Sequence, residues 1–561
     1  MCNHYNINQL TLELSTQYSP ESNHIVWTIH EFVEDLEIHH PYLFGRPREY
    51  DFSMLLKLLL YAYSRGIFTS RPIARFAQEN LPARWLTQEQ CPSHETICRF
   101  RRSDELSEIL TDSFDYFVSF LKKQGLIDDK VFVDSTKLLA DANKYTFVWK
   151  KNTIRYEEMN RQQLVTLLNE LYDYYGRASI PEDTPLTVED LGEIITVLEV
   201  QLQDLEQQIE ANPKPSPNPD KQERRFLKSR IKQVKERQSK AMAYQNQHER
   251  LGTRNSYSKT DTDATFMRMK EDPMRNGQLK PGYNLQVATR NQFFLAYQLF
   301  PNPTDTRTLI PFMKTHHTLF EQSSVVAMDA GYGSQPNYEF LDDTFPNLVP
   351  LIPYNTYRKE QSRKWREDEK KVMNWDYYES DDYYMDPKGV RFNFHAYRTR
   401  TDKYGYIRQF KEYQAEKSDA NQNLIESALT PKGYLRKVTI NPEWEYYKAK
   451  QRELLSDPEY SLIYSLRKTD VEPAFGHLKA NLGFNRFHVR GIDKVHNEIG
   501  LALMATNMRK LALIFRTNQK TQHFYSCRIK IWVFLRTYLT ASFHVQVTAL
   551  FTKMILLKTN F

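Results

Sequence analysis

Residues 128–145, DDKVFVDSTKLLADANKY, decide how the chain folds, because they turn a helical pattern into a strand that carries a carboxylate. The run from Val131 to Val133 is β-branched and aromatic, which is typical of a short buried strand. We predict that this strand ends at Asp134. A carboxylate in that place is fixed by the strand, while the loop after it lets a metal ion and a substrate reach it.

A second strand of the same kind lies in SSVVAMDAGYG, residues 323–333, and ends at Asp329. Between the two strands, GYNLQVATRNQFFLAYQLFPN, residues 282–302, predicts a hairpin that turns near Arg290 and Asn291. Strands and helices are mixed here, so we expect an α/β domain.

A third carboxylate is Glu472, on a helix predicted in YSLRKTDVEPAFGHLKANLGFNRF, residues 464–487. Three carboxylates from separate segments can bind two divalent metal ions, which activate a hydroxyl nucleophile and stabilise the leaving oxygen in phosphoryl transfer. Arg467 and Lys479 would then face DNA phosphates near the metals. Each carboxylate taken alone is more often a cap or a surface residue. Three others compete for the same role: Asp261, Asp263 and Asp470.

Residues 51–120 predict short helices joined by tight turns, with Ser93 and either Thr69 or Ser70 as caps. Such helices suit a helix-turn-helix-like reader of DNA. An ordinary helical domain with solvated arginines explains the same residues equally well. The arginines concerned are Arg65, Arg71, Arg75, Arg99, Arg101 and Arg102.

Two further segments differ from the α/β pattern around them. Residues 182–210 hold nine acidic and no basic side chains, and residues 221–250 hold ten basic and three acidic ones. With apolar residues at heptad spacing from Leu191 to Ile209, these segments predict two antiparallel helices joined at NPKPSPNPD. Residues 346–445 are rich in tyrosine and charge, and predict an insertion with short strands. Its acidic patch is interpreted as a solvated loop rather than a cation site: Asp376, Glu379, Asp381 and Asp382.

Composition bounds the class of protein. The 561 residues include 76 Lys plus Arg and 70 Asp plus Glu, a net charge of +6, and the length implies about three or four domains. The four cysteines form no CxxC pair, so neither a disulfide framework nor a cysteine-based zinc site is expected. We find no secretory signal in the first thirty residues and no uninterrupted apolar run long enough to span a bilayer. We therefore expect a soluble, cytoplasmic protein without a membrane partner.

Four long segments resemble, in matching order, the motifs of bacterial insertion-sequence DDE transposases, and most closely the IS eleven-eighty-two branch of the IS-four superfamily. They are residues 131–151, 256–289, 325–341 and 470–512. The resemblance implies an RNase H-like catalytic fold in which Asp134, Asp329 and Glu472 are the catalytic and metal-binding carboxylates. It also implies two Mg²⁺ or Mn²⁺ ions, nicking at the element ends, and transfer of the freed 3′-hydroxyl into target DNA. The implied partners are the terminal inverted repeats, the target DNA and a second copy of the chain in a synaptic dimer.

That superfamily has a signature of Tyr, Arg, the catalytic Glu and Lys around the last catalytic helix. Tyr464, Arg467, Glu472 and Lys479 resemble it, but four residues rather than three separate Arg467 from Glu472. Lys468 has the expected spacing, so both cations remain candidates. Beside this group, we predict that Arg99, Arg101 and Arg102 contact DNA from the N-terminal region.

The expected organisation has five parts. These are a helical, helix-turn-helix-like DNA-binding region at 1–125, an RNase H-like catalytic domain at 126–345 and 446–515, a helical hairpin at 155–250, a second insertion at 346–445, and a basic apolar tail at 516–561. The leading hypothesis is a transposase. The alternatives are a catalytically silent relative that only binds the element ends, and a two-metal nuclease that cuts DNA without strand transfer.

Overall fold

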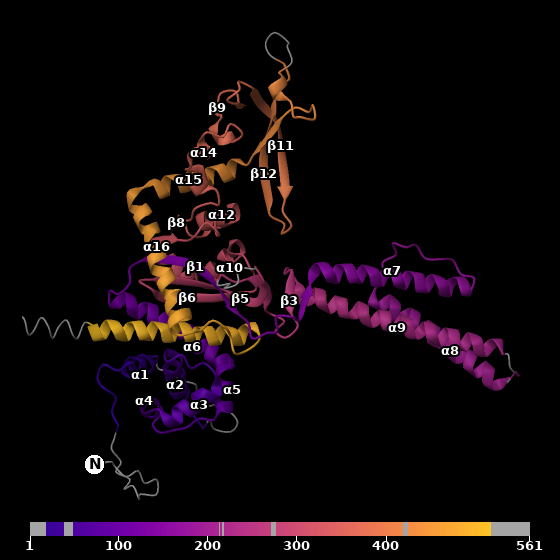
Figure 1. Ribbon diagram of the computed structural model, residues 1–561, viewed down its shortest axis with the longest axis horizontal. Coiled ribbons are helices and arrows are strands. Elements are labelled where there is room, and N and C mark those ends of the chain that lie inside the picture. The colour runs from indigo at the N-terminus through magenta and orange to yellow at the C-terminus, as the bar shows by residue number, and fades with distance from the viewer. Residues whose placement is uncertain are drawn as a thin grey trace, which may run out of the picture.

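The computed structural model describes residues 18–36, 38, 49–212, 214–215, 218–270, 277–418 and 425–517. The predicted tail therefore lies outside the described residues from position 518 onward. Figure 1 shows a central body, a long helical arm on one side and a separate sheet above it. In the described part of the chain, no helix is both long enough and apolar enough to span a membrane.

The body is built around a six-stranded mixed sheet in which β5 lies between β1 and the pair β4 and β6, and β1 is followed by β7 and β8. β1 pairs antiparallel with β5 and parallel with β7, and β7 pairs parallel with β8. The strands are β1 (Lys130–Leu139), β4 (Thr265–Arg268), β5 (Leu279–Arg290), β6 (Phe293–Phe300), β7 (Val325–Ala327) and β8 (Val349–Leu351). This confirms the mixed α/β class.

β1 is longer than the sequence predicts, because it continues past Asp134 to Leu139. The polar residues Ser135 and Lys137 resemble a loop in sequence, but they pair with Gln286 and Asn284 of β5. Pairing with β5 satisfies their backbone groups, so the strand continues although their side chains are polar. The predicted end of the strand at Asp134 is therefore wrong.

The hairpin predicted between the two carboxylate strands is confirmed as β5 and β6. Its two turn residues, Asn291 and Gln292, both have positive φ, as the tight turn that matches the twist of antiparallel strands requires.

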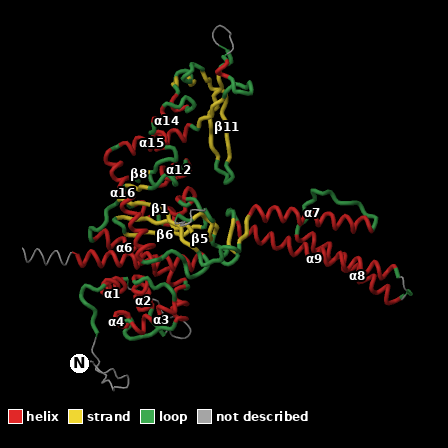
Figure 2. The backbone as a smooth tube through the Cα atoms, viewed as in Figure 1, coloured by secondary structure: helices red, strands yellow, loops and turns green. Residues whose placement is uncertain are grey.

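Residues 376–440 form a second sheet, five-stranded and antiparallel, which stands apart from the body in Figure 2. It consists of β9 (Asp376–Tyr378), β10 (Tyr383–Met385), β11 (Arg391–Thr401), β12 (Ile407–Ala415) and β13 (Lys437–Ile440). Asp382, in the acidic patch, accepts hydrogen bonds from Tyr377 and Tyr413 at 2.9 and 2.7 Å. The predicted short strands are therefore present.

The arm consists of α7 (Lys150–Tyr174), α8 (Val188–Ala211) and α9 (Pro219–Leu251), and these share an apolar core of their own. α8 begins with a capping box between Thr187 and Asp190. Ion pairs join α9 to α8, such as Lys228 with Glu206 at 2.6 Å, as the complementary charges predict. α7 is a third helix that the two-helix prediction does not contain. The arm is bounded by β2 (Phe147–Trp149) and β3 (Ser256–Ser258), which pair with each other.

The N-terminal helices share one core with the central sheet. α6 begins at the cap Ser103, carries acidic residues in its first turn and basic ones in its last, and packs against β6. Ser93 caps α5 as predicted, through its hydroxyl and the Thr96 amide. The helices are α1 (Ile25–Asp35), α2 (Phe52–Ser64), α3 (Ser70–Glu79), α4 (Leu81–Leu86), α5 (His94–Arg101) and α6 (Asp104–Lys123).

A last helix, residues 492–517, runs through the body. Its N-terminal amides are bound by the two aspartates of the SKTDTDA segment: Asp263 accepts from Ile492 at 3.0 Å and Asp261 from Gly491 at 3.4 Å. Carboxylates satisfy the free amides and the positive end of a helix dipole. Asp261 and Asp263 therefore have a structural role. The other helices are α10 (Leu309–Thr315), α11 (His317–Glu321), α12 (Gln335–Thr344), α13 (Tyr357–Glu360), α14 (Arg363–Arg366), α15 (Pro442–Ser456) and α16 (Pro458–Gly476).

Candidate active site

Two of the predicted carboxylates come from neighbouring parts of the central sheet. Asp134 is within β1, and Asp329 follows the end of β7 by two residues. The two strands run parallel with Phe132 opposite Ala327, and each aspartate lies two residues beyond this pair, so both lie at the same level of the sheet. Helix α16 contacts β1, β5 and β7 beside them. The sequence predicts that each aspartate ends its strand, whereas Asp134 lies inside β1 and Asp329 in the loop after β7.

Asp134 is largely buried, with 13% of its side chain exposed. Burial raises the pKa of its carboxyl group, and the charge of Asp329 raises it further, while Arg467 and Lys270 oppose the shift. A buried carboxylate beside another acid binds a cation favourably, because the cation relieves both the desolvation and the repulsion.

Arg467 is the cation that meets Asp134. Its Nη1 donates to Asp134 Oδ2 at 2.8 Å, and its guanidinium lies 5.9 Å from the ring centre of Tyr464. Burial lowers the pKa of Arg467, but Asp134, Tyr464 and Asp329 outweigh it, so that the net shift is upward. Lys468 is exposed. Of the two candidate signature cations, Arg467 is the one that faces the carboxylates.

Glu472 is not brought into this pair. Its side chain is exposed, whereas its neighbour Val471 is fully buried against the sheet. A helical residue five positions after Arg467 points to a different face, because five residues turn the helix by about 140° beyond one full turn. The extra residue between Arg467 and Glu472, compared with the family signature, therefore places Glu472 on a different face of α16 from Arg467. Pro473 lies inside α16, and a π-helical turn at His477–Asn481 follows the helix.

Asp470, the competitor of Glu472, is buried and has a structural role. It accepts a hydrogen bond from Thr289 Oγ1 at 2.8 Å and one from the Gln292 backbone amide at 3.1 Å. Asp470 thereby fixes the tight turn between β5 and β6 to α16.

Three lysines surround β1 just after Asp134. Lys479 donates to the backbone oxygen of Lys137 at 3.1 Å, and Lys270 donates to that of Ser135 at 3.0 Å. Burial lowers the pKa of Lys137, with Asp305 opposing the shift. Sequence reasoning finds Lys479 but misses Lys270, whose charge acts on Asp134, because nothing in its local pattern marks it as a neighbour of that carboxylate. Lys137, within β1 itself, is also missed.

The three arginines of α5 and its end separate into two environments. Arg99 and Arg102 are exposed, whereas Arg101 is buried and bonds to Glu498 of the last helix at 2.7 Å. Only Arg99 and Arg102 are therefore available at the surface for a phosphate. Arg101 instead joins the N-terminal helices to the last helix.

The two aspartates offer the donor atoms that a divalent cation requires. Mg²⁺ prefers oxygen ligands, and Asp134 and Asp329 supply carboxylate oxygens from one edge of the sheet. No group of three or more His, Cys, Asp or Glu is gathered for a metal among the residues that the structure describes. The two strand carboxylates thus fit such an ion, and a third ligand is not in place.

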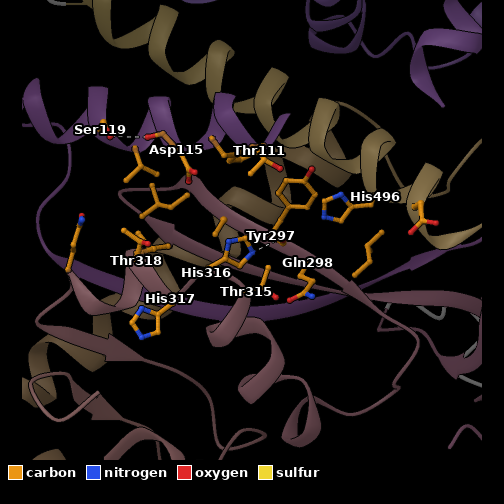
Figure 3. A pocket seen from close by; sticks show the side chains of 18 of the residues that line it. Thr111, Asp115, Ser119, Tyr297, Gln298, Thr315, His316, His317, Thr318 and His496 are labelled. Atoms are coloured by element: carbon orange, nitrogen blue, oxygen red, sulfur yellow. Dashed lines mark hydrogen bonds between the residues drawn. The ribbon is translucent and has the colours of Figure 1, made fainter. Parts of the chain in front are cut away.

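The pocket in Figure 3 lies away from these carboxylates, between α6, β6, α11 and the last helix. In this pocket the His496 ring stacks on the Tyr297 ring, with 4.5 Å between the two ring centres. Burial, with the nearby His316, lowers the pKa of His496 to about 4. Burial also lowers the pKa of His316, so both rings are neutral at pH 7.

Two family models match the chain. Residues 254–508 match the transposase DDE domain, and residues 15–103 match the transposase domain DUF772. The first match includes Asp329 and Glu472, whereas Asp134 precedes it.

The chain is 28% identical over 112 residues to proteins named probable transposase for insertion sequence element ISH11, from two strains of Halobacterium salinarum. The alignment covers 20% of this chain and 33% of the length of each relative, so only a third of each relative is matched. Among solved structures, a cryo-EM structure of the piggyBac transposase synaptic complex with hairpin DNA aligns over 87% of this chain and 78% of that one. Its identity is 10% and its TM-score 0.20, which is too low to support an argument about the fold. On the two family matches, this chain carries a transposase DDE domain, preceded by a transposase domain of the DUF772 family.

Proposed function

We propose that the chain is the DNA transposase of an insertion sequence in the IS eleven-eighty-two branch, with an RNase H-like catalytic domain. The sheet supports this fold, because it joins an antiparallel hairpin to β1 and places two parallel strands on the other side of β1. The observation that supports the function is the pair Asp134, on β1, and Asp329, just after the adjacent strand β7, with Arg467 bonded to Asp134.

Divalent metal ions are general in this family. Asp134 and Asp329 would hold them here. When bound, such ions activate an attacking hydroxyl or water and stabilise the leaving oxygen of a phosphodiester. Arg467 orients the Asp134 carboxylate, and its charge attracts a phosphate to this edge of the sheet. Lys479 and Lys270 add positive charge beside β1, where a DNA strand would lie.

Glu472 is proposed as the third carboxylate, and its exposed position sets a condition on that role. The end of α16 has to turn or shift before Glu472 faces the sheet, and the proline and the π-helical turn there are features at which helices deform. DNA or a metal ion would drive this movement by binding more tightly to the conformation in which Glu472 faces the sheet.

The remaining roles concern DNA. The N-terminal helices, with Arg99 and Arg102 exposed, are proposed to bind the terminal inverted repeats. A dimer is proposed for the synaptic complex, since two ends have to be joined. In that complex, Tyr464 and Lys468 on α16 lie next to the bound strand.

The test uses the purified full chain and duplex oligonucleotides that carry the inverted repeats found beside its gene. We expect cleavage and strand transfer in Mg²⁺ or Mn²⁺, both lost in Asp134→Asn and Glu472→Gln, with binding to the ends nearly unchanged because phosphate contacts supply most of the affinity. Glu459→Gln is the matched control, because it makes the same change at an exposed position in the first turn of α16.

The exposed position of Glu472 is also the observation that favours a second candidate, a silent protein that only binds the ends. Binding without cleavage by the wild type would establish that candidate. Cleavage without strand transfer would indicate a nuclease. Full activity of Glu472→Gln in Mg²⁺ would show that Glu472 is not the third carboxylate.

A further inference from the structure

A polar cluster, buried except for the partly exposed Asp305, lies within the central sheet next to the carboxylate pair. Asn284 and Gln286, both on β5, have no exposed surface, and neither has Tyr332, three residues after Asp329. Asn284 and Gln286 donate from their side-chain amides to the same oxygen of Asp305, at 2.8 and 3.0 Å. Tyr332 donates its hydroxyl hydrogen to Gln286. The four side chains form one connected network.

The network reaches Asp329 through the loop that carries it. Thr306, the neighbour of Asp305, donates from its hydroxyl to the Gly331 carbonyl oxygen at 2.8 Å, and the Gly331 amide donates to Asp329 Oδ1 at 2.8 Å. A Cβ at Gly331 would lie 2.9 Å from Asp329 Oδ1 and 3.6 Å from Asp305 Oδ2. The first distance is too short for a Cβ, so a glycine at position 331 lets the Asp329 carboxylate approach the loop backbone this closely.

This cluster needs an explanation other than core packing. Burying amides and a phenol in a sheet costs free energy unless they are hydrogen-bonded, and apolar side chains would fill the space at lower cost. Here both side-chain amide groups and the Tyr332 hydroxyl are bonded, whereas Asn284 Oδ1 is buried without a partner. A bonded polar network fixes the positions of its members more narrowly than apolar packing does. Gln286 bonds to Tyr332, and Thr306, beside Asp305, bonds to Gly331, so the network holds the last two residues of the segment 329–332 that begins with Asp329.

We propose that Gln286, Asn284 and Asp305 are positioning residues for Asp329. Gln286 holds the loop at Tyr332, and Asp305 with its neighbour Thr306 holds it at Gly331, so that the Asp329 carboxylate keeps one orientation toward the cation and the DNA. This inference rests on the proposed function, because it assigns the network to the same metal-binding edge.

The experiment compares Gln286→Ala with Asn507→Ala in the full chain. Asn507 is an equally buried amide, and it bonds to the backbone of Phe294 on β6, away from the carboxylates. Three quantities are measured for each variant: the unfolding midpoint in urea, binding of Mn²⁺ by titration calorimetry without DNA, and amide hydrogen exchange of the peptide that covers residues 329–333.

Both variants should lose stability, but only Gln286→Ala should weaken Mn²⁺ binding, by about tenfold, and speed exchange in residues 329–333, because one lost buried hydrogen bond corresponds to about a tenfold change. Asp305→Asn keeps an oxygen acceptor for both amides and should retain most of the Mn²⁺ affinity that Asp305→Ala loses. If Gln286→Ala behaves like Asn507→Ala in Mn²⁺ affinity and exchange, the network is structural only. If Asp305→Asn is as defective as Asp305→Ala, Asp305 is a ligand instead of a positioning residue.

Failure of this inference is distinguishable from failure of the proposed function. Mn²⁺ binding by the wild type that disappears in Asp134→Asn supports the metal-binding edge, whatever Gln286→Ala does. Mn²⁺ binding that survives in Asp134→Asn would overturn both proposals.

Discussion

Replacing Arg101 by alanine should unfold the chain more easily without removing a DNA contact. Arg101 and Glu498 are 3% and 1% exposed, and Arg101 also bonds to Ser70 and lies over the ring of Tyr63. Removing one partner of a buried ion pair costs about 3–5 kcal/mol. Glu498 still has three hydrogen bonds with His488 and Val489 in the variant. We therefore expect the free energy of unfolding to fall by an amount near the lower end of that range, about 3 kcal/mol.

The assay is urea unfolding of the full chain, with Arg99→Ala and Arg102→Ala as matched controls from the same segment. Both controls are exposed and should change the free energy of unfolding by less than about 0.5 kcal/mol. In binding to the end duplex, each control should lower the slope of log affinity against log salt by about one, as loss of a phosphate contact requires. Arg101→Ala, compared at equal folded fraction, should leave that slope unchanged.

Two results would refute this reasoning. A loss of less than about 1 kcal/mol in Arg101→Ala would mean that the pair is not buried as described. A salt slope lowered by about one would mean that Arg101 faces DNA, as the sequence pattern suggested.

Two further predictions concern groups away from the carboxylate pair. The pKa of His496 is lowered from 6.5 to about 4 in the folded chain, so between these pH values the unfolded chain binds one more proton than the folded chain. This difference contributes about 3 kcal/mol to the free energy of unfolding above pH 6.5, and the contribution should be lost as the pH falls toward 4. Urea midpoints from pH 7.5 to 4.5 should fall less steeply in His496→Asn, and parallel curves would contradict the assignment. Asp470→Ala should lose about 2 kcal/mol, since it removes two buried hydrogen bonds, while DNA cleavage at equal folded fraction stays unchanged. Lost cleavage with intact stability would make Asp470 a catalytic carboxylate.

The sequence predicts most of the sheet because strand signals are local. The apolar runs before Asp134 and Asp329 and the hairpin between them depend on a few adjacent residues, and all three are found in the structure. The end of β1 is missed because Ser135 and Lys137 are stabilised by residues about 150 positions later in the chain. α7 is missed as part of the arm because charged residues dilute its apolar stripe.

Placement of side chains is harder to predict than their secondary structure. Arg99, Arg101 and Arg102 look alike in sequence, and only the partner Glu498 separates Arg101 from the others. The residues around Glu472 match a family motif, but one extra residue between Arg467 and Glu472 changes the face of α16 on which Glu472 lies. The positioning network is invisible in sequence, because an Asn and a Gln within a strand carry no local signal of a shared acceptor.

The pairing of β2 with β3 makes the arm separable from the rest of the molecule. The chain leaves the body at Trp149 and returns at Ser256, and these two residues are direct partners across the ladder. The arm, about a hundred residues long, therefore begins and ends at two paired positions, which a two-residue turn could connect directly. Since the core of the arm shares no residue with the core of the body, each can gain or lose length without repacking the other. The chain is thus free to change how far the arm reaches while the distance between Asp134 and Asp329 stays the same.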